Sequence, residues 1–290
     1  MIKPLKLTKK TVMKEKYINV NGLNIAYVER GEACEKPPII YLHGWLDNAA
    51  SFNALAPLID YPHSIAIDLP GHGHSAHLPS YAYYHFIDGV SQLIETINAF
   101  HANKCILIGH SLGACLASII AGSIPDRIET LILLDAIGPL TTPADESALK
   151  YQTYFKQLNA LKKKRVRNYA SIDSACEHRG ASGYLAASFV GPIVERGLKR
   201  IDDVFQWRHD PRLLLPSPLK MTEAQTVAFL KEIAAPTLLI NASQGFKIKP
   251  SDYQPRLDAV SNLNLKTLDC GHHLHVEKPN ECANLINDFL

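Results

Sequence analysis

Short apolar runs alternate along this chain with segments of helical periodicity. Apolar residues recur every three or four positions at 84–100, as one face of a helix requires. The apolar runs suit strands that are buried on both faces of a sheet, and they predict strands at 39–42, 64–67, 105–108, 128–134, 236–240 and 263–268. This alternation predicts an α/β fold with a mostly parallel central sheet and helices on both faces.

Both ends of the pattern carry further signals. Residues 15–29 read as two strands around Asn21-Gly22, a pair that favours a tight hairpin turn. Residues 279–290 are amphipathic and predict a closing helix. Lysines crowd residues 1–14, which we expect to form a basic, frayed leader.

The alternation stops between residues 139 and 233. This stretch has helical periodicity at 146–162 and 223–231 but no convincing strand. An insertion of this kind between two late strands predicts a helical lid. The chain therefore divides into the leader at 1–14, a core at 15–138 and 234–290, and the lid, or cap, at 139–233.

The composition of the 290-residue chain limits the functions that it can have. The net charge of +2 is too small to indicate nucleic-acid binding, and no apolar run reaches the roughly 18 residues that a membrane span needs. The 6 cysteines form no Cys-x-x-Cys pair, which favours reduced thiols in the cytoplasm. No His/Asp spacing indicates a metal site. We expect no cofactor, and a monomer or homodimer.

The most specific motif is Gly109-His110-Ser111-Leu112-Gly113, between a predicted strand and a helix of small residues. This is the setting of a nucleophile elbow, in which a strained turn exposes the serine at the sheet edge. Glycine is required two positions before and after it, because side chains there would collide. The motif predicts Ser111 as a nucleophile and makes His110 a candidate substrate-binding residue.

Two more polar segments directly follow predicted strands. One is His-Gly-Trp-Leu-Asp-Asn at 43–48, and the other is Gly-His-His-Leu-His at 271–275. With the elbow and the Asp-Leu-Pro-Gly-His-Gly loop at 68–73, they give the chain a resemblance to the α/β-hydrolase fold over nearly its whole length after the leader. The 43–48 turn with Ser51-Phe52, and Leu-Ile-Leu-Leu-Asp at 131–135, are most similar to serine hydrolase-like proteins.

The resemblance implies a base for the nucleophile. A serine hydroxyl attacks only when a base accepts its proton. His272 follows Gly271 after the last strand, where the family places its histidine. His273 and His275 are the competing candidates.

The expected oxyanion hole consists of two backbone amides, those of Trp45 and Leu112. His43, Gly44 and the Trp45 side chain are expected to contact the substrate. Asp68 is expected to hold its loop rather than to react.

The acid that orients the base has two candidates. Many relatives place it in a Gly-x-x-Asp turn after the lid, but residues 241–246 contain no carboxylate. Asp135, at the end of the strand before the lid, occupies the place used by other relatives, haloalkane dehalogenases among them. Asp135 is therefore the expected acid, and Asp252 is the alternative; both keep the order Ser, Asp, His.

Together these residues predict a serine hydrolase that cleaves a small to medium, mostly apolar ester through an acyl-enzyme on Ser111. Its expected partner is a small-molecule substrate. A serine nucleophile argues against relatives that attack with aspartate. Carbon–carbon bond hydrolases, non-metal haloperoxidases and acyltransferases share the triad, and a ligand-binding protein with little turnover would keep the pocket, so these remain alternatives.

Overall fold

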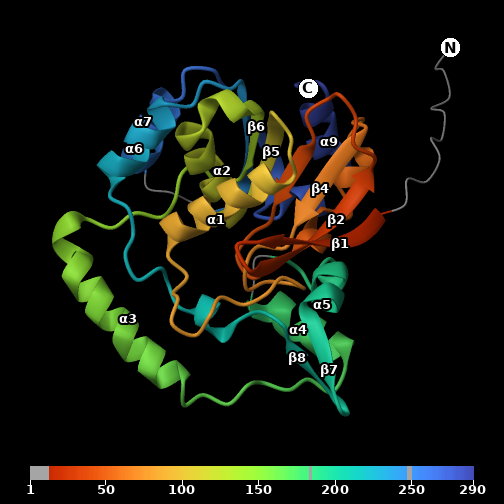
Figure 1. Ribbon diagram of the computed structural model, residues 1–290, viewed down its shortest axis with the longest axis vertical. Helices are drawn as coiled ribbons and strands as arrows, with labels where there is room; N and C mark the ends of the chain where they lie inside the picture. The colour runs from red at the N-terminus through yellow and green to blue at the C-terminus, as the bar shows by residue number, and fades with distance from the viewer. Residues whose placement is uncertain (1–12, 183–184, 247–249) are drawn as a thin grey trace.

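The computed structural model describes residues 13–182, 185–246 and 250–290. Within them, an 8-stranded sheet lies between two layers of helices, and an insertion extends beyond one edge (Figure 1). The sheet order is β1-β2-β4-β3-β5-β6-β9-β10; β2 pairs antiparallel with β1 and β4, and the other pairs are parallel. The predicted mostly parallel sheet is confirmed. The strands are β1 Met13–Val20, β2 Leu23–Gly31, β3 Ile39–Leu42, β4 His63–Ile67, β5 Cys105–His110, β6 Ile128–Leu134, β9 Thr237–Gln244 and β10 Leu263–Gly271.

The central strands are apolar without interruption because both of their faces are buried. In β3, Ile40 and Leu42 join the core on one face, whereas Ile39 and Tyr41 join the core on the other. Successive side chains of a strand point to opposite faces, so a strand between two helical layers needs apolar residues at every position.

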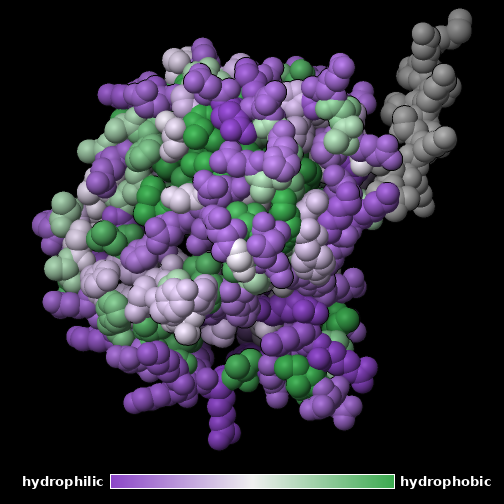
Figure 2. Space-filling view, viewed as in Figure 1, coloured by the Kyte–Doolittle hydropathy of each residue, from purple (hydrophilic) through white to green (hydrophobic). Residues whose placement is uncertain are grey.

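Helices cover both faces of the sheet. One layer contains α1 Phe86–Ala99, α2 Leu112–Ser123, α6 Glu223–Lys231 and α7 Pro250–Ala259. The other contains η1 Ala49–Phe52, η2 Ala56–Leu58, α8 Leu274–Glu277 and α9 Pro279–Asn287. A single turn, η3 Pro125–Arg127, leads into β6. On the face shown in Figure 2, hydrophilic residues predominate and hydrophobic ones form separate patches.

The insertion between β6 and β9 has its own small core. It contains η4 Ala144–Glu146, α3 Ser147–Leu161, α4 Ile172–Ser182, α5 Gly191–Gly197, β7 Leu198–Ile201, β8 Val204–Trp207 and η5 Pro211–Leu214. The expectation that it lacks strands is wrong, because β7 and β8 form an antiparallel hairpin. The predicted helix at 223–231 is α6, which packs on α2 and α7 in the core layer.

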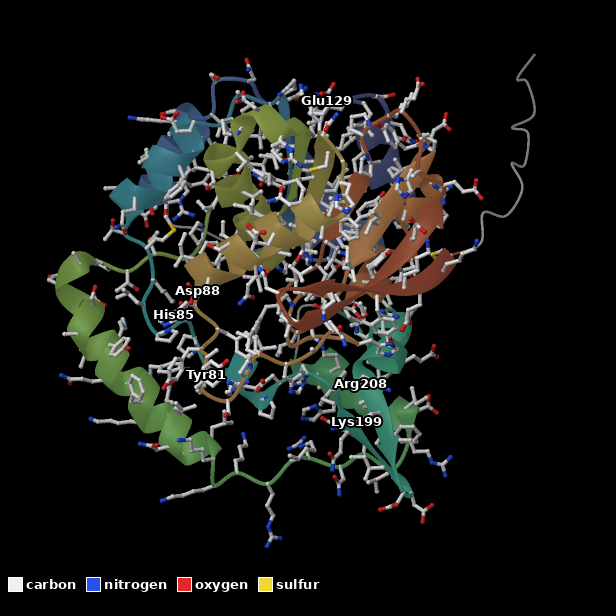
Figure 3. All side chains as sticks on the ribbon, in the orientation of Figure 1. Tyr81, His85, Asp88, Glu129, Lys199 and Arg208 are labelled. Atoms are coloured by element: carbon white, nitrogen blue, oxygen red, sulfur yellow. The ribbon has the colours of Figure 1, made fainter. Side chains whose placement is uncertain are left out.

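Polar and aromatic contacts attach the insertion to the core. The Tyr83 ring lies 6.0 Å from the ring of Tyr154 on α3, and the Tyr84 hydroxyl donates to Asp210 over 2.9 Å. Figure 3 shows the neighbouring Tyr81 and His85 on the same loop, which precedes α1 and faces α3. The insertion is therefore held by the loop before α1.

Two predictions concern the N-terminal segment, a basic leader and a hairpin. The leader lies outside the described residues except for Met13 and Lys14, which open β1. The predicted hairpin is confirmed: Asn21 and Gly22, with φ of 52° and 83°, connect β1 to β2.

Two glycine-to-alanine substitutions should have opposite effects on stability. A Cβ at Gly113 would lie 1.9 Å from the Leu42 carbonyl oxygen, so Gly113→Ala must push α2 away from β3. We expect it to lower the free energy of unfolding by about 1–3 kcal/mol or more. A Cβ at Gly89 in α1 would make only an ordinary contact, 3.6 Å from Leu116, so Gly89→Ala should raise it by about 0.4–1 kcal/mol. Urea unfolding measures both, and equal effects would contradict the prediction.

Candidate active site

The turn between β5 and α2 holds Ser111 in a strained conformation. Its φ is 51°, a left-handed value that few residues other than glycine adopt. The flanking glycines make the turn possible, because a Cβ at Gly109 would lie 2.4 Å from the Gly113 carbonyl oxygen. The Ser111 amide donates to Leu134 of β6 over 3.0 Å. The strained backbone is thus fixed by its neighbours.

Ser111, His272 and Asp135 form a chain of hydrogen-bond contacts. The Ser111 Oγ lies 2.9 Å from Nε2 of His272, and Nδ1 of the same ring lies 2.6 Å from Oδ2 of Asp135. His272 and Asp135 are only 6% and 5% exposed. The three residues that sequence reasoning selected therefore lie together at the carboxyl edge of the sheet.

Backbone amides also hold the Asp135 carboxylate in place. Ala242 donates to Oδ1 over 2.8 Å, and Phe246 donates to Oδ2 over 2.9 Å. Gly245 lets this loop pass so closely that a Cβ there would lie 2.0 Å from Oδ2. Asp252, the alternative acid, lies on α7, where it accepts from the Ser251 hydroxyl over 3.3 Å. It is therefore Asp135 that contacts His272.

The loop after β3 is held by a buried histidine. His43 Nε2 accepts from the Leu69 amide over 3.0 Å, so its hydrogen is on Nδ1, which donates to the Gly44 carbonyl over 2.7 Å. Burial lowers the pKa of His43 and keeps the ring neutral. His43 was expected to contact the substrate, but its fully buried ring instead positions the loop that carries Trp45.

The two amides expected to form an oxyanion hole come from this loop and from the elbow. Leu112 opens α2, so its N–H belongs to the first helical turn, where amides have no partner within the helix. The Trp45 indole is 51% exposed and donates to the Leu213 carbonyl in η5 over 2.7 Å. The Trp45 side chain thus connects the loop to the insertion.

A cluster of buried histidines lies behind these residues. His110 Nε2 lies 2.9 Å from the His272 carbonyl oxygen, and its ring centre is 4.3 Å from that of His275. Burial and the neighbouring histidines hold the pKa of His110 well below its usual value. His110, a candidate substrate-binding residue, is fully buried and belongs to this cluster.

Asp47 joins the cluster to the insertion, a role that the sequence did not reveal. Its Oδ1 accepts from Arg179 of α4 over 2.8 Å, and its Oδ2 lies 3.1 Å from His273 Nε2. Burial alone would raise the pKa of the Asp47 carboxyl, but His273 and Arg179 outweigh it and hold the pKa well below its usual range. In the sequence, Asp47 could have been noticed because it lies in the loop that begins with His43-Gly44.

Asp68 holds its loop, as expected. Its carboxylate accepts from the amides of Ala49 and His74, each over 2.7 Å, and pairs with Arg196 of the insertion at 2.8 Å. A fully buried carboxylate with these partners is satisfied in place.

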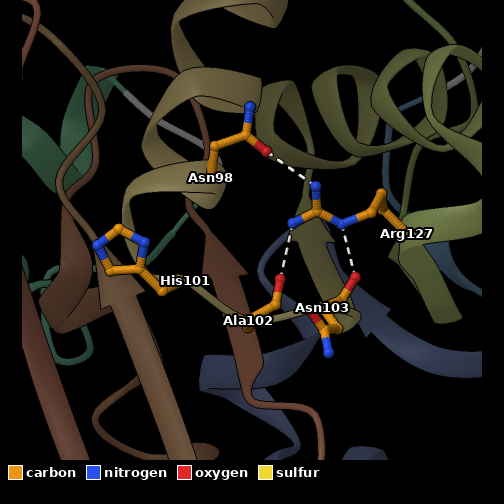
Figure 4. A pocket seen from close by; sticks show the side chains of 5 residues that line it. All are labelled: Asn98, His101, Ala102, Asn103 and Arg127. Atoms are coloured by element: carbon orange, nitrogen blue, oxygen red, sulfur yellow. Dashed lines mark hydrogen bonds between the residues drawn. The ribbon is translucent and has the colours of Figure 1, made fainter.

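A surface hollow lies at the opposite edge of the sheet. It is lined by Asn98, His101, Ala102, Asn103 and Arg127 (Figure 4). Arg127 already donates to the carbonyls of Ala102 and Asn103 and to the Asn98 side chain, at 2.7, 2.6 and 3.1 Å. Because ligands of such sheets bind beyond the carboxyl ends of the strands, this hollow is not the candidate site.

Comparison with known proteins gives the family. A family model described as the alpha/beta hydrolase fold matches residues 37–279. The chain belongs to the α/β-hydrolase family. It is 30% identical to a serine hydrolase-like protein of Dictyostelium discoideum, over 93% of this chain and 79% of that protein. The chain is accordingly a serine hydrolase-like member of the family and a hydrolase.

Solved structures agree with this family assignment. A hypothetical protein from Pseudomonas aeruginosa PAO1 matches with a TM-score of 0.87 and 33% identity, over 95% of this chain and 97% of that one. The thioesterase domain from the curacin biosynthetic pathway matches with a TM-score of 0.80 and 25% identity, over 95% and 99%. No helix within the described part of this α/β-hydrolase is long and apolar enough to cross a membrane.

Acid should weaken this α/β-hydrolase through its buried histidines. Burial lowers the pKa of His275 to about 3, whereas an unfolded histidine titrates near 6.5. Below about pH 6.5 the unfolded chain therefore binds a proton that the folded chain does not, and stability should fall by up to about 1.4 kcal/mol per pH unit until the folded pKa is reached.

Urea unfolding from about pH 7 to about pH 4.5 measures this slope. His275→Gln should reduce the slope by the contribution of one proton, up to about 1.4 kcal/mol per pH unit. Ser51→Ala removes the hydroxyl that lies 2.6 Å from His275 Nε2 without removing the titrating ring, so it should lower stability but keep the slope. An unchanged slope in His275→Gln would show that this ring is not responsible.

Proposed function

We propose that this protein is a carboxylic ester hydrolase that cleaves small to medium, mostly apolar esters through an acyl-enzyme on Ser111. The observation that carries the proposal is the contact chain from Ser111 Oγ through His272 to Asp135, with separations of 2.9 and 2.6 Å. This order of groups is the one that activates a serine for acyl transfer.

The proposed reaction begins when His272 Nε2 accepts the Ser111 hydroxyl proton as Oγ attacks the ester carbonyl. Asp135 keeps the hydrogen of His272 on Nδ1, which leaves Nε2 free to accept, and it stabilises the imidazolium that forms. The tetrahedral oxyanion accepts hydrogen bonds from the Trp45 and Leu112 amides. The alcohol leaves with the proton from His272. Water then attacks the acyl-enzyme with the same base and releases the acid.

Apolar side chains around the site support an apolar acyl group. The Phe246 ring lies 6.2 Å from His272, and Phe246 and Trp45 are both substantially exposed. Elsewhere in the insertion, Tyr151, Phe189 and Leu214 are also exposed. Apolar side chains with a few polar groups are the usual lining of a small-molecule pocket. We propose that the insertion is a lid that limits the length of the acyl chain.

A thioester is the second candidate substrate. The similar curacin domain is named a thioesterase, and a thioester presents the same acyl carbonyl to Ser111. A pair of substrates with one acyl group, as an oxygen ester and as a thioester, separates the two. The predicted cytoplasmic location and the monomer-or-homodimer state stay predictions.

Ser111 should be required for hydrolysis and for covalent labelling. Wild-type protein should hydrolyse p-nitrophenyl esters, with a preference for short to medium acyl chains over emulsified long-chain triglycerides. It should also react with a fluorophosphonate probe. Ser111→Ala should lose both properties while its circular dichroism spectrum is unchanged. Substantial activity in the variant would refute the serine mechanism, and faster turnover of the emulsified lipids would refute the proposed lid.

Asparagine substitutions at Asp135 and Asp252 test which of the two carboxylates acts as the acid. Asp135→Asn should lower kcat by about 10⁴-fold, because the amide no longer holds the hydrogen of His272 on Nδ1. Asp252→Asn makes the same chemical change on α7 and should leave kcat near the wild-type value. Steady-state kinetics on one p-nitrophenyl ester measures both. A large loss in Asp252→Asn with little loss in Asp135→Asn would reverse the assignment.

A further inference from the structure

Three side chains with metal-ligand chemistry meet inside the protein behind Ser111. They are Asp47 from the loop after β3, His110 from the elbow and His273 from the loop after β10. One possible ligand atom from each lies within 4.8 Å of the other two, a grouping found among the described residues. Their exposed fractions are 2%, 0% and 5%, so the group is part of the interior.

The hydrogen bond made by Nε2 of His110 determines whether the other ring nitrogen, Nδ1, carries a hydrogen or a lone pair. Nε2 lies 2.9 Å from the His272 carbonyl oxygen, which can only accept, so Nε2 carries the hydrogen. Nδ1 of the neutral ring then presents a lone pair. It is buried and has no hydrogen-bond partner within the described part of the chain. Metal-binding histidines commonly donate their second ring N–H to a carbonyl in this way.

The lone pair of His110 faces a second acceptor. Asp47 Oδ2 lies 4.0 Å from Nδ1, and His273 Nε2 lies 3.1 Å from the same carboxylate oxygen. Two buried acceptors that face each other need a positive or hydrogen-donating group between them. The absence of a side chain at Gly44 lets its backbone lie against both atoms, since a Cβ there would be 2.9 Å from Nδ1 and 3.2 Å from Oδ2.

We propose that Asp47, His110 and His273 bind a divalent transition-metal ion, with zinc as the best-suited ion. Two imidazole nitrogens and one carboxylate oxygen are ligands that zinc accepts, with water as a fourth. Tetrahedral bonds of about 2.0–2.2 Å place ligand atoms roughly 3.3–3.6 Å apart. Two of the three separations are 3.1 and 4.0 Å, and all three lie within 4.8 Å, so the side chains must move together when the ion binds.

The charges and protons of the site set what metal binding requires. Arg179 donates to Oδ1 of Asp47, which leaves Oδ2 for the ion. His273 Nε2, which faces Oδ2 over 3.1 Å, can bind the ion only after its hydrogen moves to Nδ1, a buried nitrogen with no hydrogen-bond partner within the described residues. The positive charge of Arg179 so close by makes the affinity lower than that of a structural zinc site. The ion would connect the three loops that carry the proposed catalytic groups.

Direct metal binding tests the proposal without reference to catalysis. Full-length protein is stripped with a chelator, dialysed against zinc chloride and analysed for bound zinc; cobalt(II) replaces zinc for absorption spectra. We expect one zinc per chain and the visible absorption bands of four-coordinate cobalt(II). Ser111→Ala should bind equally well, so loss of the proposed hydrolase activity would leave this result intact.

Single-residue variants identify the ligands. His110→Gln and His273→Gln should each weaken zinc binding at least about tenfold, the effect of losing a metal ligand or its support. His275→Gln removes a histidine of the same buried cluster that is not among the three. His209→Gln removes a histidine of the insertion, whose ring stacks on that of Trp207 at 5.7 Å. Both variants should bind zinc as wild type does. Circular dichroism checks folding, and Asp47→Asn replaces any variant that fails to fold. Absence of stoichiometric zinc, or equal binding in all variants, would overturn the proposal and indicate that water bridges Asp47 and His110.

Discussion

The close approach of helix α2 to strand β3 is the constraint on which the site depends. Gly113 brings the α2 backbone so near Leu42 that no side chain fits between them. The chain can reach this position from β5 only through a left-handed residue, and Ser111 is that residue, with φ of 51°. The hydrogen bond from its amide to Leu134 fixes the turn from the other side. The location of Ser111, the proposed nucleophile, is thus set by backbone packing.

The local patterns of the sequence were sufficient for the sheet and for the turn that carries Ser111, whereas His272 was proposed from the family resemblance. Uninterrupted apolar runs mark strands that are buried on both faces, and the Gly109 and Gly113 pair marks the elbow. The β7–β8 hairpin was missed because it is only partly buried, and its turn residue Asp202, with φ of 50°, is followed by aspartate rather than glycine. Such a segment carries neither a continuous apolar run nor a typical turn signal.

The family resemblance suggested Asp135 as the acid, but no local pattern could reveal the buried cluster around Asp47. Asp135 was selected because some relatives place their acid at the end of the strand before the lid. Asp47, His110 and His273 belong to three separate loops, and Arg179 belongs to the insertion. Their contacts depend on how those loops pack, which the spacing of residues along the chain does not encode. The same holds for Trp45, whose indole binds η5.

Because the proposed acid, Asp135, directly follows β6, the end of β9 and the loop after it need to supply only backbone groups. The end of β9 and this loop contribute the amides of Ala242 and Phe246, and every amino acid except proline carries such an N–H group. The contact with Asp135 therefore places no demand on the side chains of Ala242 and Phe246, whereas Gly245 is constrained because a Cβ there would meet Asp135. Phe246 lies beside His272. A substitution at Phe246 can thus change the surface next to His272 while the amide that holds Asp135 stays in place.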